Sequence, residues 1–287
     1  MPLLPWIGSV ALVLVLAAPV RALDITTCGQ VVPRRTTGVL QVDLSCTPTP
    51  SNDNFYRFGI ELEGGATLDL NGHTLTLLGC GNAAGVLCNG NCVVTSSTGT
   101  ATIVGPSPQL NEGCNGIFGR TVSASKLAVS SFGNGIFAGR RLTAADVTAS
   151  NNFRGLRART AVLDNVTAND NGDAGILTQD HPSRVRVTNS TVSGNTHFGI
   201  FNGGVGGGSI HAAGVTVTNN GCEGVVAGEG KHVQLTDSHV TGQPKDVETA
   251  IRPLLLNTVC GISSHLTGGC ADGPNGTWGV CANDVSV

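Results

Sequence analysis

Residues 147–176 read VTASNNFRGLRARTAVLDNVTANDNGDAGI, and this stretch contains two copies of one pattern. A Val-Thr phrase opens each copy and a Gly-aliphatic phrase closes it. The Gly-aliphatic phrase recurs along the chain as Gly116-Ile117, Gly135-Ile136, Gly155-Leu156, Gly175-Ile176, Gly199-Ile200 and Gly224-Val225. The repeat is therefore 19 to 25 residues long. A repeat of this length with short β-branched segments predicts one coil of a solenoid.

The physical consequence of this repeat is a stack of β-coils. A single coil cannot bury its own apolar side chains. Coils stacked about 4.8 Å apart pair their backbone N–H and C=O groups with the coils on either side. The aliphatic residue after each Gly then forms an inward column. The sequence therefore predicts an all-β chain, folded as a single right-handed parallel β-helix of seven or eight coils with disulfide-stapled end caps.

Two further columns follow from the same register. The residues two positions beyond the aliphatic ones also point inward, because strands have a period of two. They are mostly small, as a narrow interior requires: Gly119, Ala138, Ala158, Thr178, Asn202 and Ala227. A set of asparagines suits tight turns with left-handed backbone and can stack as a hydrogen-bonded ladder. This set is Asn152, Asn171, Asn195 and Asn220.

The chain divides into four predicted segments. Residues 1–22 resemble a signal peptide, since an apolar stretch from Leu3 to Ala18 precedes Val20-Arg21-Ala22. The alternative is a retained membrane anchor, but the stretch is short for a span of about 20 residues. We expect residues 23–65 to form an N-terminal cap, 66–242 the β-helix and 243–287 a C-terminal cap. The protein is then secreted, extracellular or periplasmic, without membrane contact after cleavage.

Composition limits the partners. Of 287 residues, 12% are charged, and the net charge is −3. This charge is too small to favour nucleic acid or an anionic membrane. We expect a monomer.

The ten cysteines all follow the leader, which predicts disulfides and an oxidising compartment. Cys114 and Cys222 lie five coils apart, about 24 Å, and cannot pair with each other. The expected pairs are Cys28–Cys46, Cys80–Cys88, Cys92–Cys114, Cys222–Cys260 and Cys270–Cys281. Zinc binding by Cys88 and Cys92 is the alternative, disfavoured because no second ligand pair accompanies them.

The stretch Leu68-Asp69-Leu70-Asn71-Gly72-His73-Thr74 resembles the opening coil of secreted right-handed β-helix repeat proteins, the pectate-lyase-like superfamily. The segment Thr277-Trp278-Gly279-Val280-Cys281 is similar to the endings of some bacterial members. The resemblance covers most of residues 60–245. It implies the fold more than an activity, since lyases, hydrolases, epimerases and non-enzymatic adhesins share this architecture.

Outward-facing positions give the candidate binding surface. In the expected register, arginines from successive coils stand beside exposed phenylalanines. Guanidinium groups suit carboxylates and sulfates, and aromatic faces suit sugar rings. We therefore expect an acidic polysaccharide as partner, although solvated arginines and phenylalanines under a flanking loop are the simpler interpretation. The expected binding residues are Phe118, Arg120, Phe137, Arg140, Arg157 and Arg159.

An enzyme is the alternative. Asp180, His181 and Arg184 follow on the next coil, and an arginine beside a His or Arg base suits a polysaccharide lyase or epimerase acting on uronate. No convergent acid cluster accompanies them. Gln179-Asp180-His181-Pro182 also departs from the Asp-Pro-His order of alginate-epimerase-like sites. The sequence therefore favours a non-catalytic scaffold or binding protein.

The sequence predicts no metal or cofactor. Asp170 and Asp173 lie in Asn-Asp-Asn-Gly-Asp, which offers oxygens at alternate positions as calcium loops do. The stretch lacks the distal glutamate and falls where the coil turns. A structural turn is therefore the favoured interpretation.

Overall fold

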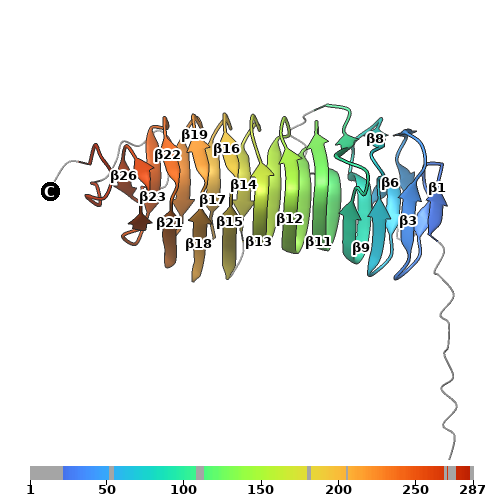
Figure 1. Cartoon of the computed structure of the whole chain (residues 1–287), viewed down its shortest axis with the longest axis horizontal. Coiled ribbons are helices and arrows are strands. Elements are labelled where there is room, and N and C mark those ends of the chain that lie inside the picture. The colour runs from blue at the N-terminus through green and yellow to red at the C-terminus, as the bar shows by residue number, and fades with distance from the viewer. Residues whose placement is uncertain are drawn as a thin grey trace, which may run out of the picture.

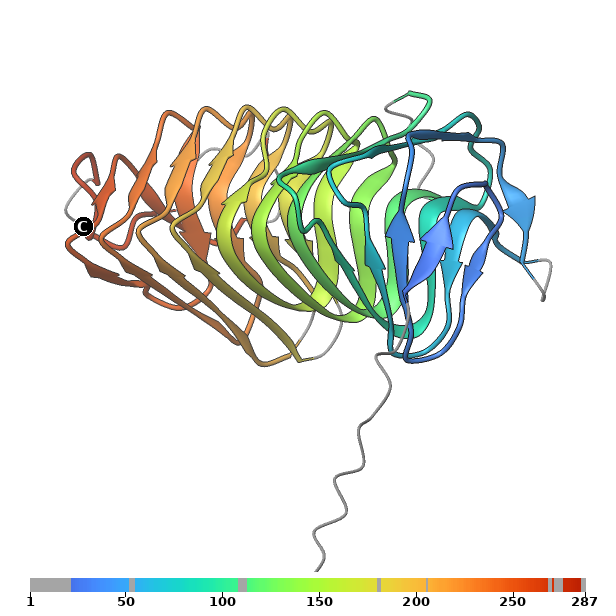
Figure 2. The same ribbon diagram turned by 45° about the vertical axis from the view of Figure 1, so that its right-hand side comes forward.

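The computed structural model describes residues 22–51, 55–107, 113–179, 182–204, 206–267, 270 and 276–284. The chain winds into one elongated stack of coils, with β1 (Leu23–Ile25) at one end and β26 (Ser263–His265) at the other (Figure 1). Figure 2 shows successive coils following one another along the long axis. Among the described strands, those of successive coils pair in parallel, while β5 (Thr49–Pro50) pairs antiparallel with β6 (Arg57–Leu62). The predicted all-β, parallel β-helix is confirmed.

Three parallel ladders, here called sheets 1, 2 and 3, form the sides of the stack. Sheet 1 contains β2 (Val31–Val32), β6, β9 (Ala83–Thr95), β11 (Cys114–Ser130), β12 (Asn134–Ala149), β13 (Arg154–Thr167), β14 (Ala174–Thr178), β17 (Phe198–Asn202), β20 (Glu223–Ala227), β23 (Lys245–Thr249) and β26. The longer strands β9, β11, β12 and β13 bend into sheet 2, and the last three continue into sheet 3.

The other two sheets are completed by shorter strands. Sheet 2 also contains β1, β3 (Thr37–Leu40), β7 (Ala66–Asp69), β15 (Ser183–Thr188), β18 (Gly208–Ala213), β21 (Lys231–Thr236) and β24 (Leu254–Leu256). Sheet 3 also contains β4 (Leu44–Cys46), β8 (Thr74–Leu77), β10 (Ala101–Val104), β16 (Thr191–Ser193), β19 (Thr216–Thr218), β22 (His239–Thr241) and β25 (Val259–Cys260).

The predicted register of sheet 1 is confirmed residue by residue. Ile117 pairs with Ile136, and the column continues through the aliphatic residue of each later copy. These side chains are fully buried, so they form the core of the stack. The second inward column is also in register, from Gly119 to Ala227.

The asparagine ladder is confirmed, but its backbone conformation was predicted wrongly. Asn171 Nδ2 donates to Asn195 Oδ1 at 2.8 Å, and Asn195 Nδ2 donates to Asn220 Oδ1 at 2.8 Å. The left-handed backbone falls one residue earlier, at Asn151, Asp170, Gly194 and Asn219. The preceding residue therefore makes the turn, and the buried Asn provides the stacked amide.

Parallel pairing extends beyond residues 66–242. In sheet 2, β3 pairs with β7 near one end and β24 pairs with β21 near the other. Sheet 1 contains eleven strands among the described residues, more than the seven or eight coils predicted. The Gly-aliphatic phrase is absent from the first and last of these strands. Val32 lies in register with Gly119 of the second inward column, and Ser263 takes the position of the aliphatic residue. The division into caps at 23–65 and 243–287 stays a prediction.

Five disulfides are present, and one was predicted. The Cys28–Cys46 bond is confirmed, and no described cysteine is free. The predicted pairs Cys80–Cys88, Cys92–Cys114, Cys222–Cys260 and Cys270–Cys281 are wrong. The chain instead joins Cys80–Cys114, Cys88–Cys92, Cys222–Cys270 and Cys260–Cys281.

The physical reason lies in where the coils turn. Cys88 and Cys92 lie on either side of the bend in β9 between sheets 1 and 2, with their Cα atoms 5.8 Å apart. Cys80 lies before β9 and reaches Cys114 on the next coil. Because all four thiols are used in this way, zinc binding by Cys88 and Cys92 is also excluded.

The five disulfides indicate an oxidising, extracytoplasmic compartment. In the part of the chain that the structure describes, no helix is long and apolar enough to cross a membrane. The predicted signal peptide, residues 1–22, lies outside the described residues apart from its last residue.

Candidate functional site

The arginines predicted on successive coils lie together at one corner of the stack. Arg120, Arg140 and Arg159 line an open hollow of about 720 Å³, here called the basic hollow. Its other described lining residues are Cys88, Asn89, Gly90, Phe118, Gly119 and Gly139. No carboxylate is among these described lining residues.

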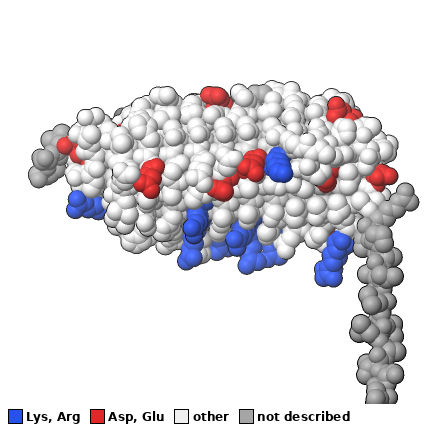
Figure 3. Space-filling view, viewed as in Figure 1, with Lys and Arg blue, Asp and Glu red and all other residues white. Residues whose placement is uncertain are grey.

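The position of this hollow follows from how the strands bend. The pairing of β11 is interrupted between Gly119 and Thr121, and that of β12 between Ala138 and Arg141. Each interruption marks the corner between sheets 1 and 2, where side chains point away from the core. Arg120 and Arg140 are exposed there. On the face in Figure 3, Lys and Arg project mainly along the lower edge, and Asp and Glu lie above them.

A row of aromatic side chains lies beside the basic hollow on the outer surface of sheet 1. Phe118 pairs in register with Phe137, with ring centroids 5.3 Å apart. The guanidinium carbon of Arg157 lies 4.7 Å from the centroid of Phe137, a cation–π arrangement. The ring centroids of Tyr56 and Phe118 lie 4.6 Å apart, so the segment that contains Tyr56 partly covers the Phe118 ring.

The predicted outward row of Phe118, Phe137 and Arg157 is therefore present. Arg157 also donates to Gln179 Oε1 at 3.2 Å. It does not line the basic hollow, unlike Arg159 two residues later. The structure thus brings together three of the four predicted arginines in the basic hollow, whereas Arg157 contacts Phe137 in the aromatic row.

The predicted catalytic residues are not brought together by the described part of the chain. Asp180 and His181 lie outside the described residues. Arg184 is exposed in sheet 2, where it pairs with Thr160 rather than standing in the column of Arg120. Catalysis by these three residues stays a prediction.

The Asp170–Asp173 stretch forms a turn between coils. Asp173 Oδ2 accepts a hydrogen bond from Arg154 Nε at 2.7 Å, and its Oδ1 lies 3.2 Å from His197 Nδ1. Asp170 has a φ of 55°, the left-handed backbone of a tight turn. These contacts favour the structural interpretation over calcium binding.

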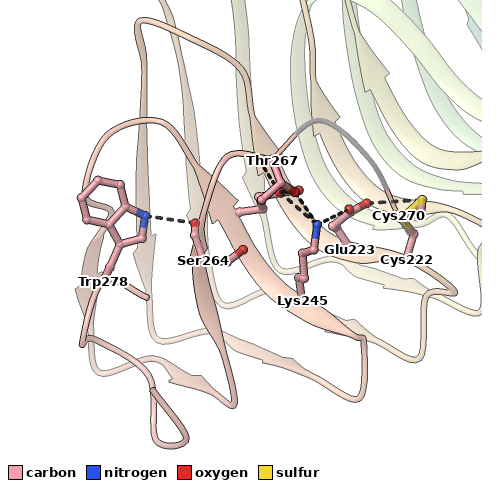
Figure 4. A network of polar contacts seen from close by, with 8 residues as sticks. Cys222, Glu223, Lys245, Ser264, Thr267, Cys270 and Trp278 are labelled. Carbon is pink, nitrogen blue, oxygen red and sulfur yellow. Dashed lines mark hydrogen bonds and ion pairs between the residues drawn. A yellow bond between two sulfur atoms is a disulfide. The ribbon is translucent and has the colours of Figure 1, made fainter. Parts of the chain in front are cut away.

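A buried charge network, missed in the sequence, lies toward the C-terminal end of sheet 1 (Figure 4). Lys245 Nζ lies 3.1 Å from Glu248 Oε1 and 3.5 Å from Glu223 Oε1. All three side chains are only 2% exposed. Glu248 also accepts from the backbone N–H of Thr267 at 2.8 Å, and Lys245 donates to Thr267 Oγ1 at 2.7 Å. The network therefore fastens the segment at Thr267 to sheet 1.

Burial makes this network sensitive to protonation. Desolvation, with the neighbouring charge of Glu248, raises the pKa of Glu223 to about 7. The two glutamates line a cavity of about 250 Å³ with Phe198, Phe201 and Leu266. A group that titrates near neutrality can exchange a proton, but the burial of Glu223 beside Leu266 favours a structural role.

One sequence signal could have revealed this network. Glu223 immediately precedes the Gly of its repeat, at a position taken by Ala174 and Phe198 in the two preceding coils. A charge inside a strand that is otherwise apolar needs a partner. The register provides one, since Glu223 pairs with Lys245 of the next coil.

Cys222, Glu223 and Cys270 also lie close enough to hold a metal ion. However, Cys222 and Cys270 form a disulfide. Thiolates are therefore not available there.

Comparison with known proteins gives information on the fold and none on a specific activity. No family model and no curated protein matches the sequence. The structure is similar to the crystal structure of pectate lyase Pel9A, with a TM-score of 0.50 and 14% sequence identity. The match covers 90% of this chain and 74% of that chain. The predicted resemblance to right-handed, pectate-lyase-like β-helix proteins is thereby confirmed for the fold.

Proposed function

We propose that this protein is a secreted, non-catalytic β-helix protein that binds an acidic polysaccharide at the basic hollow. One observation carries the proposal. Arginines from three successive coils line a single hollow beside Phe118, and none of the described residues lining it is acidic.

The geometry suits a linear anionic polymer. Coils in a parallel stack are about 4.8 Å apart, so a chain lying along the stack meets a new guanidinium at each coil. Guanidinium groups bind carboxylates and sulfates through paired hydrogen bonds, and the half-buried Phe118 offers an apolar surface to a sugar ring. The protein as a whole is slightly negative, with a charge of −3, so the attraction is local to the hollow.

The test is retention on immobilised polygalacturonate, alginate and heparin, compared with an uncharged glucan. The wild type should bind one or more of the acidic glycans, should bind less tightly as salt increases, and should not bind the glucan. Arg140→Gln should weaken binding by about three- to tenfold, the effect of losing one exposed charged contact. Arg252→Gln, an exposed arginine on a distant coil, is the matched control and should bind as the wild type does.

The same samples test the enzyme alternative. A lyase produces unsaturated sugars that absorb ultraviolet light, and an epimerase changes the uronate composition of the polymer. Product formation that Arg184→Gln abolishes would replace the binding proposal. Equal retention of the wild type and Arg140→Gln would show that the polysaccharide does not bind at the basic hollow.

A further inference from the structure

We infer that the polysaccharide site continues into a second hollow lined by Arg34 and Arg35, and that the two hollows together select long chains over short ones. This inference rests on the proposed function and extends it to two arginines nearer the N-terminal end of the stack.

The second hollow adjoins the first. It has a volume of about 600 Å³, and Asn89, Gly90 and Arg120 line both hollows. Arg120 therefore stands at the boundary, where its guanidinium can serve a ligand in either one. Arg34 and Arg35 lie in the connection between β2 and β3 and are exposed.

Three glycines, Gly64, Gly65 and Gly90, line the passage between the two hollows. Gly65 has a φ of 81° and Gly90 a φ of 110°, backbone conformations that disfavour any side chain there. A Cβ atom on Gly90 would lie 3.7 Å from the Cα atom of Gly64. No side chain rises from these three positions, so nothing at them blocks a chain that passes from Arg35 toward Arg120.

The charges of the two hollows favour the same ligand. Together their described lining residues include five arginines: Arg34, Arg35, Arg120, Arg140 and Arg159. Glu63 is the single acidic group among them, and its Oε2 already accepts a hydrogen bond from the backbone N–H of Arg34 at 3.0 Å. A polyanion that spans both hollows thus gains contacts in the second one, whereas a short oligomer occupies one hollow at a time.

Length dependence is the consequence. Contacts in the second hollow become intramolecular once the first is occupied, which raises the affinity for any chain long enough to reach both. The test is calorimetric titration with three series of increasing length, which are oligogalacturonates, alginate oligosaccharides and heparin-derived oligosaccharides. In the wild type, the longest members of the series that binds should bind at least about tenfold more tightly than the shortest.

Two variants should remove this gain. Arg34→Gln/Arg35→Gln should leave the affinity for the shortest bound oligomers within about twofold and abolish most of the increase with length. Gly64→Leu keeps every charge but places a side chain in the passage, and it should have the same effect. An added Cβ there would meet only Asn89 O at 3.4 Å, so the fold can accept it. Thermal unfolding should confirm that both variants remain folded.

The control is Arg186→Gln/Arg252→Gln, which removes the same charge from two other exposed positions and should keep the length dependence. Equal affinity for short and long oligomers in the wild type would overturn this inference alone. So would a double Arg34/Arg35 variant that keeps the wild-type length dependence, or one that weakens short and long oligomers equally. If no series binds, the proposed function fails as well.

Discussion

Glu223 is the residue whose environment differs most from what its sequence position suggests. Its carboxyl group is buried on sheet 1, between Lys245 and Glu248, and its Oε2 lies 3.8 Å from the sulfur of Cys270. The nearby lysine favours the charged form, but burial and the second carboxylate outweigh it and raise the pKa of Glu223 to about 7. The folded protein therefore holds this proton at pH values where an unfolded chain releases it.

This difference predicts how stability changes with pH. A free glutamate has a pKa of 4.5, so the folded state binds more protons than the unfolded state between about pH 4.5 and 7. The contribution of Glu223 to the free energy of unfolding should thus fall as pH rises through this range, by at most on the order of 3 kcal/mol. Glu223→Gln cannot ionise and should lose this dependence. Chemical denaturation of both proteins from pH 4.5 to 8 measures it.

Comparing the wild type with Glu223→Gln isolates the contribution of Glu223 to the pH dependence, because all other carboxyl groups are the same in both proteins. Burial also raises the pKa of Asp246, and hydrogen bonds lower the pKa of Asp43 and Asp164. Glu229→Gln removes an exposed carboxyl from the turn after β20. The free energy of unfolding of this variant should depend on pH as that of the wild type does. A Glu223→Gln variant that is less stable than the wild type at pH 8, or that keeps the same slope, would contradict the assignment.

At the scale of the coil, the asparagine ladder explains the glycine of the central repeats. A Cβ atom on Gly175 would lie 2.8 Å from Asn195 Nδ2 and 2.5 Å from Val192 Cγ1. The corresponding atoms on Gly155 and Gly199 would lie 3.0 and 2.9 Å from ladder amides. The Gly-aliphatic phrase thus marks the place where one coil approaches the ladder too closely for any side chain.

Gly175→Ala should therefore destabilise the protein by about 1–3 kcal/mol, the cost of overpacking a filled interior. Gly139→Ala is the matched control, because a Cβ atom there would meet only Gly119 O at 3.8 Å. The midpoints of denaturant unfolding compare the two variants. Equal midpoints would show that the glycine is not required for close approach.

The sequence predicts those features that repeat from coil to coil. The inward column of Ile117 recurs in each copy and the ladder of Asn171 in four of them, and a period near 20 places both in register. Features that occur once are different. Cys80 pairs with Cys114 because of how two loops meet at a coil boundary. Glu248 meets Thr267, which lies in a segment that has lost the repeat. No periodicity encodes such contacts, so four disulfides and the attachment of Thr267 to the charge network were not predictable from the repeat.

The candidate site shows the same division. The alignment of Arg120, Arg140 and Arg159 was predicted from spacing, and in the structure the three residues line one hollow. Their role in binding stays a prediction. The extension toward Arg34 was not predicted, because the first coil lacks the Gly-aliphatic phrase that would have set its register.

At the scale of the whole molecule, the protein is a rod with a basic corner. Stacking turns a spacing of about 20 residues along the chain into about 4.8 Å along the long axis. Arginines distant in sequence thereby become neighbours on one line, which matches a linear ligand better than a compact one. The molecule needs no high net charge for this purpose, because three side chains on adjacent coils create the local field.

The most direct test of the central claim is the affinity of Arg120→Gln/Arg140→Gln/Arg159→Gln for the acidic glycan that the wild type binds best, measured at low and at physiological salt. We expect a loss of affinity of at least about tenfold and a weaker dependence on salt than in the wild type. Arg184→Gln/Arg186→Gln/Arg252→Gln, which lowers the net charge equally, should retain most of the affinity. If the two triple variants bind equally well, the basic hollow is not the binding site.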